Sequence, residues 1–293
     1  MDSAFGEGCT CVAGTVRRIF AQMVRFVKVS SSKPPKIGLK FGIDLPILVC
    51  RFMTLKGSNH YANAEVRAGQ VRTAEVDEGL RAHMLRVYNY MSAALAITGV
   101  VAYAAAASGI YYSIAQTPLI WVVMLAPLGL VFFLSARIHK MSAAAAQTTF
   151  WVYSALMGLS LSYVFLAYTG ESVVTTFFIT AAAFGSLSLY GYTTKRDLSG
   201  MGSFMMMGLF GIIIASVVNI FLGSSALHFA ISVIGVLVFA GLTAWDTQDI
   251  KNMYFEGDQA DTGTKKAVMG ALRLYLDFIN MFLFMLQFFG NRE

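Results

Sequence analysis

The sequence predicts an all-α integral membrane protein, a bundle of seven transmembrane helices. The chain has 293 residues, of which 57% are hydrophobic and only 13% are charged, whereas soluble domains are about a quarter charged. Its mean hydropathy is +0.63. Between Arg86 and Asp249 the ionisable residues are rare and clustered, and the segments that separate them are apolar or small. A water-soluble fold cannot hide this much apolar surface, so we expect these segments to lie in lipid.

Each apolar segment is long enough for one or two membrane crossings, because a helix needs about 20 apolar residues to cross roughly 30 Å of hydrocarbon. A helix also satisfies its own backbone hydrogen bonds, as lipid requires. We therefore predict a transmembrane domain at 87–293 with seven helices, which cover residues 88–110, 118–136, 146–168, 173–193, 203–222, 226–248 and 267–289.

The basic residues of the short loops indicate the orientation, because Lys and Arg near the membrane remain on the cytoplasmic side. If the N-terminus is cytoplasmic, the outer loops and the C-terminal tail hold Arg292 alone. The inner loops then hold seven basic residues, which are Arg137, Lys140, Lys195, Arg196, Lys251, Lys265 and Lys266. The sequence thus predicts a cytoplasmic N-terminus and, with seven helices, an external C-terminus.

Two segments precede the predicted helices. Residues 61–86 alternate acids and bases and read as a cytoplasmic amphipathic helix that leads into the first span. Residues 1–60 hold nine of the Lys and Arg residues but only three acids, and a Lys-Pro-Pro-Lys stretch at 33–36 breaks helix. This extension is expected to be disordered or to reflect a start site further downstream; an organelle targeting peptide is the alternative.

All three cysteines lie in the extension, at 9, 11 and 50, without the spacing of a four-ligand zinc site. No cofactor is expected. The basic residues of the extension are not interleaved with aromatic residues, so we do not expect nucleic-acid binding. The bilayer itself is the predicted partner.

Asp246 and Asp277 are the candidate functional residues, because a carboxylate within an apolar span is costly and marks function by default. Asp246 lies near the inner end of the sixth span and Asp277 about ten residues into the seventh. If the two meet, they would share a proton and titrate as one unit. The alternatives are a solvated Asp246 at a helix end and a local pair between Asp277 and Arg273.

The same residues do not support an enzymatic function. An intramembrane aspartyl protease would carry Gly-x-Gly-Asp at its second acid, and the sequence before Asp277 is Tyr-Leu. A Gly-x-Ser-Gly serine protease motif, a phosphate-binding loop and a His-Glu-x-x-His helix are also absent from the sequence. We therefore expect that the protein is not an enzyme.

Three segments resemble the transmembrane Bax inhibitor motif family, specifically its bacterial branch. They occur in the expected order, and the resemblance covers about 75–293. The segments are Trp-Asp-Thr-Gln at 245–248 with Ile-Lys at 250–251, Leu-Tyr-Leu-Asp-Phe-Ile-Asn at 274–280, and the loop at 191–199.

The resemblance implies a seven-helix fold with the last helix central and a calcium leak whose opening depends on pH. Asp246 and Asp277 match the family's proton-sensing pair beside the pore, where they would bind Ca²⁺ weakly and transiently. The family's basic clamp on this pair has Arg137 as its nearest match, with Lys140 as the alternative. Arg273 stands where a small polar residue is expected, and is a candidate modulator of the pair.

The leading functional hypothesis is thus a pH-regulated calcium leak channel of the bacterial inner membrane, with Ca²⁺ as the permeant ion. The alternative hypothesis is an interaction protein that modulates a membrane-anchored protease or a stress response without transport, as is thought of some bacterial relatives. The basic extension keeps the mitochondrial inner membrane as an alternative location.

Overall fold

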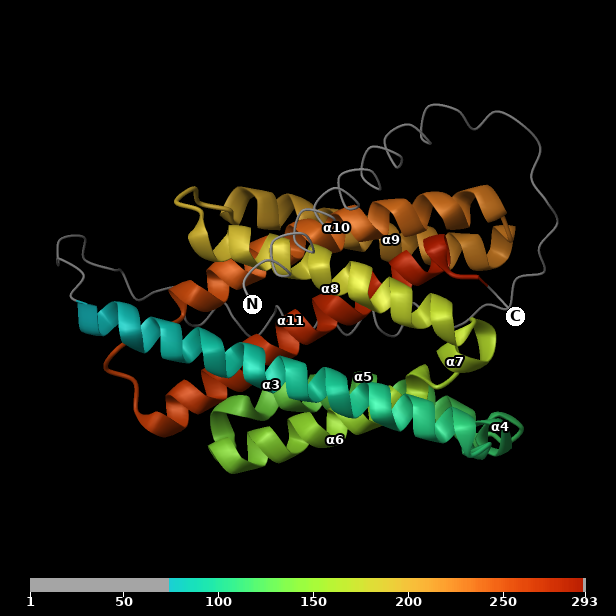
Figure 1. Cartoon of the computed structure of the whole chain (residues 1–293), viewed down its shortest axis with the longest axis horizontal. Helices are drawn as coiled ribbons and strands as arrows, with labels where there is room; N and C mark the ends of the chain where they lie inside the picture. The colour runs from blue at the N-terminus through green and yellow to red at the C-terminus, as the bar shows by residue number, and fades with distance from the viewer. Residues whose placement is uncertain (1–73, 292–293) are drawn as a thin grey trace, which may run out of the picture.

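The computed structural model describes residues 74–291 and shows a bundle of long helices (Figure 1). Among them are seven helical segments that are long and apolar enough to cross a membrane, as predicted. The 1–60 extension with its cysteines, and the part of the amphipathic segment at 61–73, lie outside the described residues. No strand occurs within 74–291.

The elements run in the order α3 (Ala74–Ala107), α4 (Ile110–Ala115), α5 (Leu119–Arg137), a short 3-10 turn η2 (Ile138–Lys140), α6 (Ala143–Leu161), α7 (Val164–Ala167), α8 (Gly170–Thr193), α9 (Ser199–Leu222), α10 (Ser225–Asn252) and α11 (Ala260–Phe289). The predicted helix positions are therefore confirmed. Most of the helix ends differ from the predicted ends by a few residues.

The first helix differs most from the prediction, because α3 begins at Ala74 and continues without a break into the first span. Residues 74–86 are thus part of one long helix. Leu80, Met84 and Val87, which share one face of that helix, are all buried in the core. Charged residues on the other face obscured this continuity in the sequence.

Local sequence explains where several helices begin and end. Ser142, Thr169 and Ser224 each accept a hydrogen bond from the backbone N–H three residues later, and so cap α6, α8 and α10. Gly109 and Gly223 have φ values of 71° and 59°, which only glycine adopts without cost; Gly109 precedes the first residue of α4, and Gly223 ends α9. These turns fix the lengths of the membrane-crossing helices.

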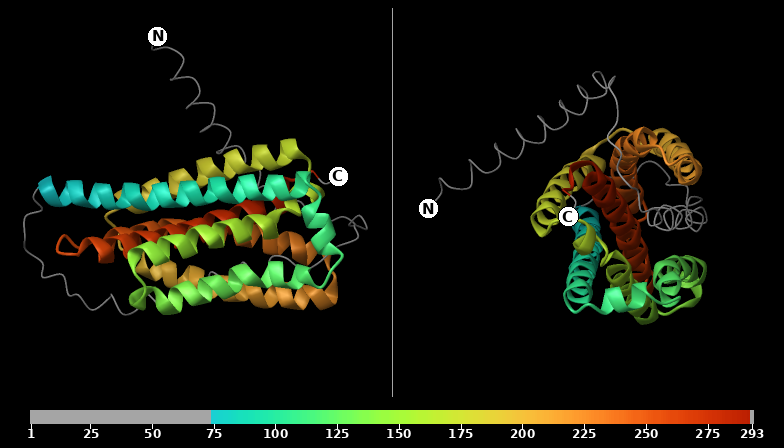
Figure 2. Two further views of the ribbon diagram at one scale, coloured as in Figure 1. Left: turned by 90° about the horizontal axis from the view of Figure 1, so that it is seen from below. Right: turned by 90° about the vertical axis from the view of Figure 1, so that its right-hand side faces the viewer.

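The last helix is central, as expected. Of its most apolar window, 94% is buried inside the protein, against 17% for α5 and for α9. Around α11 lie α10, α3, α8 and α6, whereas α5 packs on α6 and α9 packs on α10 at the periphery (Figure 2). The two peripheral helices are also the most apolar spans. Lipid-facing helices must be apolar all round, and the enclosed helix is free to hold polar side chains.

Candidate functional site

The site lies between α10 and α11, which pack against each other more extensively than any other pair of helices. Their contacts show an antiparallel arrangement. Near one end Gly270 lies against Ile250, and near the other end the hydroxyl of Ser232 donates a 2.8 Å hydrogen bond to the side-chain oxygen of Gln287. The register between the two helices is therefore fixed over most of their length.

This register places Asp246 and Asp277 at the same level. The rings of Phe239 and Phe284 pack together with centroids 6.0 Å apart. Asp246 follows Phe239 by seven residues, and Asp277 precedes Phe284 by seven, so each acid lies two turns, or about 10 Å, from the ring pair along its helix. Both steps lead toward the same end of the bundle, and both keep to the facing sides of the helices.

The two acids are completely buried, each with 0% of its surface exposed. The reading of Asp246 as a solvated acid at a helix end is therefore wrong, because α10 continues to Asn252 and neighbouring helices cover the carboxylate. Two acidic side chains enclosed at one level between adjacent spans form the most unusual polar feature of the described residues. We call Asp246 and Asp277 the acid pair.

A partly buried ion pair lies one helical turn from the acid pair. The guanidinium of Arg273 donates a 2.5 Å hydrogen bond to Asp249. Arg273 precedes Asp277 by four residues on α11, and Asp249 follows Asp246 by three on α10. Only 2% of the Arg273 side chain is exposed, against 32% for Asp249. A cation thus lies beside the acid pair on the same two helices.

The predicted clamp residues lie elsewhere. Arg137 and Lys140 are exposed at the turn between α5 and α6, and the Arg137 guanidinium lies over the ring of Phe133, 6.0 Å from its centroid. Within the described residues neither side chain makes an ion pair or hydrogen bond to Asp246 or Asp277. Their role as a clamp stays a prediction, whereas Arg273 is the basic residue that the structure buries nearby.

Sequence reasoning missed the hydroxyl chain that reaches the acid pair's helix from α3. Thr247, next to Asp246, donates to the carbonyl of Thr243 at 2.8 Å. A hydroxyl has one proton to donate, and Thr247 uses its proton for this bond. Thr247 therefore accepts in its 2.9 Å hydrogen bond with Ser188. Ser188 donates to Thr247 and so accepts in its 2.6 Å hydrogen bond with Tyr88. Three helices, α3, α8 and α10, are joined.

A second hydroxyl chain joins α3 to α11 and α6. Thr98 donates to the carbonyl of Ser154 at 2.9 Å, so its 2.7 Å contact with Tyr275 has the tyrosine as donor. Tyr275 also packs edge-on against Tyr153, with ring centroids 5.6 Å apart. No sequence pattern predicts this pairing, because the partners are more than a hundred residues apart.

The segments that carry the family resemblance contact one another at the end of the bundle that contains Lys195, Arg196 and Lys251, here called the basic end. The amide of Gln248 accepts from the backbone of Leu198 and donates to the carbonyl of Arg196, both at 2.8 Å. Gln248 therefore fastens the loop between α8 and α9 to the helix that holds Asp246.

The described residues contain no group of three or more His, Cys, Asp and Glu side chains that could hold a metal ion. The acid pair supplies two carboxylates at one level. Calcium takes about six to eight oxygen ligands, so any cation at this position would need water or backbone carbonyls as well.

Comparison with known proteins decides the family. The family model described as "Inhibitor of apoptosis-promoting Bax1" matches residues 80–293. The chain belongs to this Bax inhibitor family. The match covers every described helix except the first residues of α3, and it includes both members of the acid pair.

Individual proteins from several bacteria are also similar to the chain. The inner membrane protein YbhL of Escherichia coli K12 is 49% identical over 219 residues, which are 73% of this chain and 94% of that protein. An uncharacterized protein of Rickettsia prowazekii is 52% identical over 218 residues, 74% of this chain and 92% of its own length. A Caulobacter vibrioides protein is 48% identical over 231 residues, with coverage of 74% and 92%. With seven candidate spans, the chain is a multi-pass inner membrane protein.

Proposed function

We propose that the protein is a pH-regulated calcium leak channel of the inner membrane, in which Asp246 and Asp277 sense protons. The observation that carries the proposal is the burial of two acids at one level on adjacent membrane-spanning helices. An ionisable group at such a place is costly to keep and indicates function by default. No enzyme motif supports catalysis, and the proposal does not include an enzymatic role.

Proton sensing follows from the proximity and burial of the acids. Two carboxylates in a space of low dielectric cannot both be charged without a large penalty, so they exchange protons as one unit. The hydrogen bonds and packing that enclose them change when a proton binds. Protonation of one acid therefore alters the contact between α10 and α11.

The proposal also uses the attraction between the ionised acids and Ca²⁺. Two carboxylates provide charge but too few oxygen atoms for tight binding. Weak and transient binding suits permeation, because an ion that enters a pore must also be able to leave it. The same protonation that changes the helix contact removes the charge that attracts the cation.

Arg273 and Asp249 support a closed state in this scheme. Their ion pair joins α10 and α11 one turn from the acid pair, on the side of the basic end. A helix displacement that opens a path beside Asp246 would have to break this ion pair or move both of its residues together. Arg273 thus acts from within the bundle, and the clamp role of Arg137 or Lys140 stays a prediction.

Few other titratable groups surround the acid pair. Tyr88 of α3 reaches α10 through the hydroxyl chain that ends at Thr247, the residue after Asp246, and Tyr153 of α6 packs on Tyr275, two residues before Asp277. Helix α9, which packs on α10, holds no charged residue, and in α8 the sole charged residue is Glu171 in the first turn. Arg273 and Asp249 are the charged groups one turn away.

Calcium flux into liposomes tests the proposal. The full chain would be reconstituted around an entrapped calcium dye, and flux would be measured across a pH series for wild type, Asp246→Asn and Asp277→Asn. Asp261→Asn is the matched control, because Asp261 begins α11 and is exposed. We expect the pH dependence to be lost in both variants and kept in the control.

Unchanged, pH-dependent flux in both acid variants would refute the proposal. If liposomes with protein leak no faster than empty ones, the protein does not conduct calcium alone. Recovery of a membrane-anchored protease on the purified chain would then favour the alternative hypothesis, an interaction protein that modulates proteolysis or stress response without transport.

A further inference from the structure

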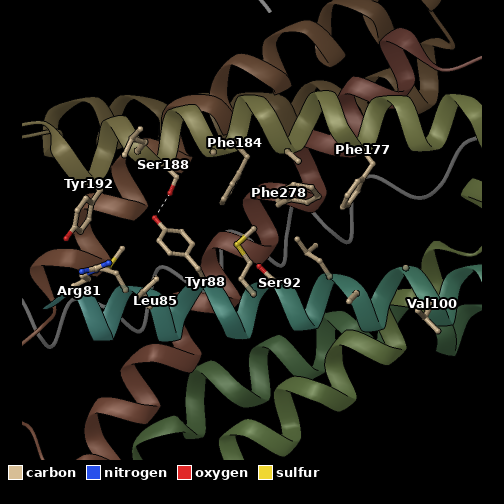
Figure 3. A pocket seen from close by; sticks show the side chains of 18 residues that line it. Arg81, Leu85, Tyr88, Ser92, Val100, Phe177, Phe184, Ser188, Tyr192 and Phe278 are labelled. Carbon is tan, nitrogen blue, oxygen red and sulfur yellow. Dashed lines mark hydrogen bonds between the residues drawn. The ribbon is translucent and has the colours of Figure 1, made fainter. Parts of the chain in front are cut away.

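A long crevice lies between α3 and α8 and has a volume of about 1010 Å³ (Figure 3). Its two walls come from helices that are distant in the sequence, and Phe278 of the central helix α11 contributes to its floor. The volume is at the upper limit of the roughly 300–1,000 Å³ that small-molecule pockets usually have. The crevice is therefore large enough to hold an extended chain molecule.

The crevice is apolar and opens sideways. Phe184 and Phe278 are buried within it, whereas Leu85, Val100 and Leu189 on its walls are more than half exposed. Because α3 and α8 both cross the membrane, these exposed side chains face the hydrocarbon of the bilayer. An apolar cavity stays free of water, so lipid is the material that can fill it.

One end of the crevice is cationic. Arg81 of α3 and Tyr192 of α8 line the same end, as Figure 3 shows. Lys251 of α10 does not line the crevice itself but contacts Tyr192, because its ammonium donates a 2.8 Å hydrogen bond to the carbonyl of Tyr192 and lies 5.1 Å from that ring's centroid. An ammonium has three donors, so Lys251 retains the capacity to bind an anion. This is also the basic end of the bundle.

We propose that the crevice is a binding site for one anionic phospholipid from the leaflet at the basic end. The phosphate of the headgroup binds Arg81 and Lys251, and one acyl chain lies along the apolar wall toward Phe278. Charge complementarity selects the headgroup, since basic side chains at a membrane surface attract anionic lipids. The lateral opening allows the lipid to enter from the bilayer.

The dimensions agree with this occupant. Nineteen residues separate Arg81 from Val100 along α3, a rise of about 28 Å, which is close to the hydrocarbon thickness of a bilayer. One acyl chain from one leaflet would occupy the half of the crevice nearest Arg81. That half includes Tyr88 and Ser188, whose hydrogen bond forms part of the wall. The bound lipid would pack directly against the chain of hydroxyls that leads to α10.

Lipid selectivity of the purified full chain tests this site. Native mass spectrometry in micelles would compare phosphatidylglycerol with phosphatidylcholine of the same acyl chains, and glycerol phosphate would serve as the headgroup alone. We expect phosphatidylglycerol to bind in preference, and Arg81→Gln to weaken it about fivefold, the effect of one basic residue near the membrane surface. The matched control is Arg86→Gln, an exposed arginine of the same helix that does not line the crevice.

The acyl-chain half of the proposal has its own variants. A side chain added at Gly185 meets no atom within 4 Å and would extend into the crevice, so Gly185→Leu should weaken lipid binding severalfold. Gly211→Leu is the control, because Gly211 is equally open but lies on α9. Equal binding of the two lipids, equal loss with Arg81→Gln and Arg86→Gln, or unchanged binding with Gly185→Leu would overturn the site. Glycerol phosphate binding as tightly as the whole lipid would also overturn it.

Discussion

Substitution of Arg273 by Gln removes the cation that joins α11 to α10 beside the acid pair. Its partner Asp249 lies 2.5 Å away, and the arginine side chain is only 2% exposed. Loss of one partner from a buried ion pair costs about 3–5 kcal/mol, because the other charge remains without compensation. Asp249 is 32% exposed, so water can solvate it, and we expect a cost of about 2–3 kcal/mol, below that range.

A double-mutant cycle isolates the interaction. Unfolding by detergent titration in micelles would be measured for Arg273→Gln, Asp249→Asn and the double variant. The coupling energy from this cycle would be compared with that of the Lys265 and Asp261 pair. That control pair is also ionic, with an N···O distance of 2.6 Å, but its side chains are 20% and 49% exposed. We expect a coupling of about 1–3 kcal/mol for the buried pair and about 0.3–0.5 kcal/mol for the control. Equal coupling energies would refute the reasoning.

Three further predictions concern other contacts. Gly191→Ala places a methyl group in steric overlap with the backbone carbonyl oxygen of Ala244 on α10 and should cost about 1–3 kcal/mol in thermal unfolding, whereas Gly211→Ala, which meets nothing within 4 Å, should cost nothing measurable. Tyr275→Phe removes one buried hydrogen bond and should cost about 1 kcal/mol; an unchanged melting temperature would contradict this. Ser199 donates two hydrogen bonds to Asp197 and lowers the pKa of that carboxyl, so this contact stabilises the fold above the ordinary pKa and is lost as pH falls through the lowered one. Ser199→Ala should raise that pKa in an NMR titration, and no change would contradict the assignment.

The membrane architecture was predictable because charge spacing and helix length determine it. The predicted boundaries at 226–248 and 267–289 lie within α10 and α11, and the structure extends each helix toward the basic end. That extension matters, since it converts Asp246 from a residue near a helix end into one enclosed by helix on both sides. Bilayer arithmetic alone gives no information on how far a helix continues beyond the hydrocarbon.

The acids of the candidate site were predictable, but their neighbours were not. Asp246 and Asp277 stand out because each is a rare charge in an apolar segment. The pairing of Arg273 with Asp249 depends on the rotation of α10 and α11 about their axes, and a local pair with Asp277 fits the spacing on α11 equally well. The family resemblance suggested Arg137 as the clamp of the acid pair, although its helix lies at the edge of the bundle.

The crevice could not be predicted from the sequence at all. Its walls join residues that are distant in the sequence, such as Tyr88 and Ser188, which are 100 positions apart, and each wall alone is an ordinary apolar helix face. Whether two apolar faces close against each other or leave a gap depends on packing around α11, where Phe278 lines the crevice and packs on Phe184 of α8. Hydrophobic periodicity shows which face is apolar but not what covers it.

The shared proton of the acid pair is the central claim, and infrared spectroscopy of the carboxyl groups tests it most directly. Difference spectra of the purified protein would be recorded across a pH titration for wild type, Asp246→Asn and Asp277→Asn. The proposed function predicts a protonated carboxyl band in the wild type that either single substitution removes or shifts, because the proton belongs to both residues. Two independent bands, each lost with only its own aspartate and unaffected by the other substitution, would contradict it.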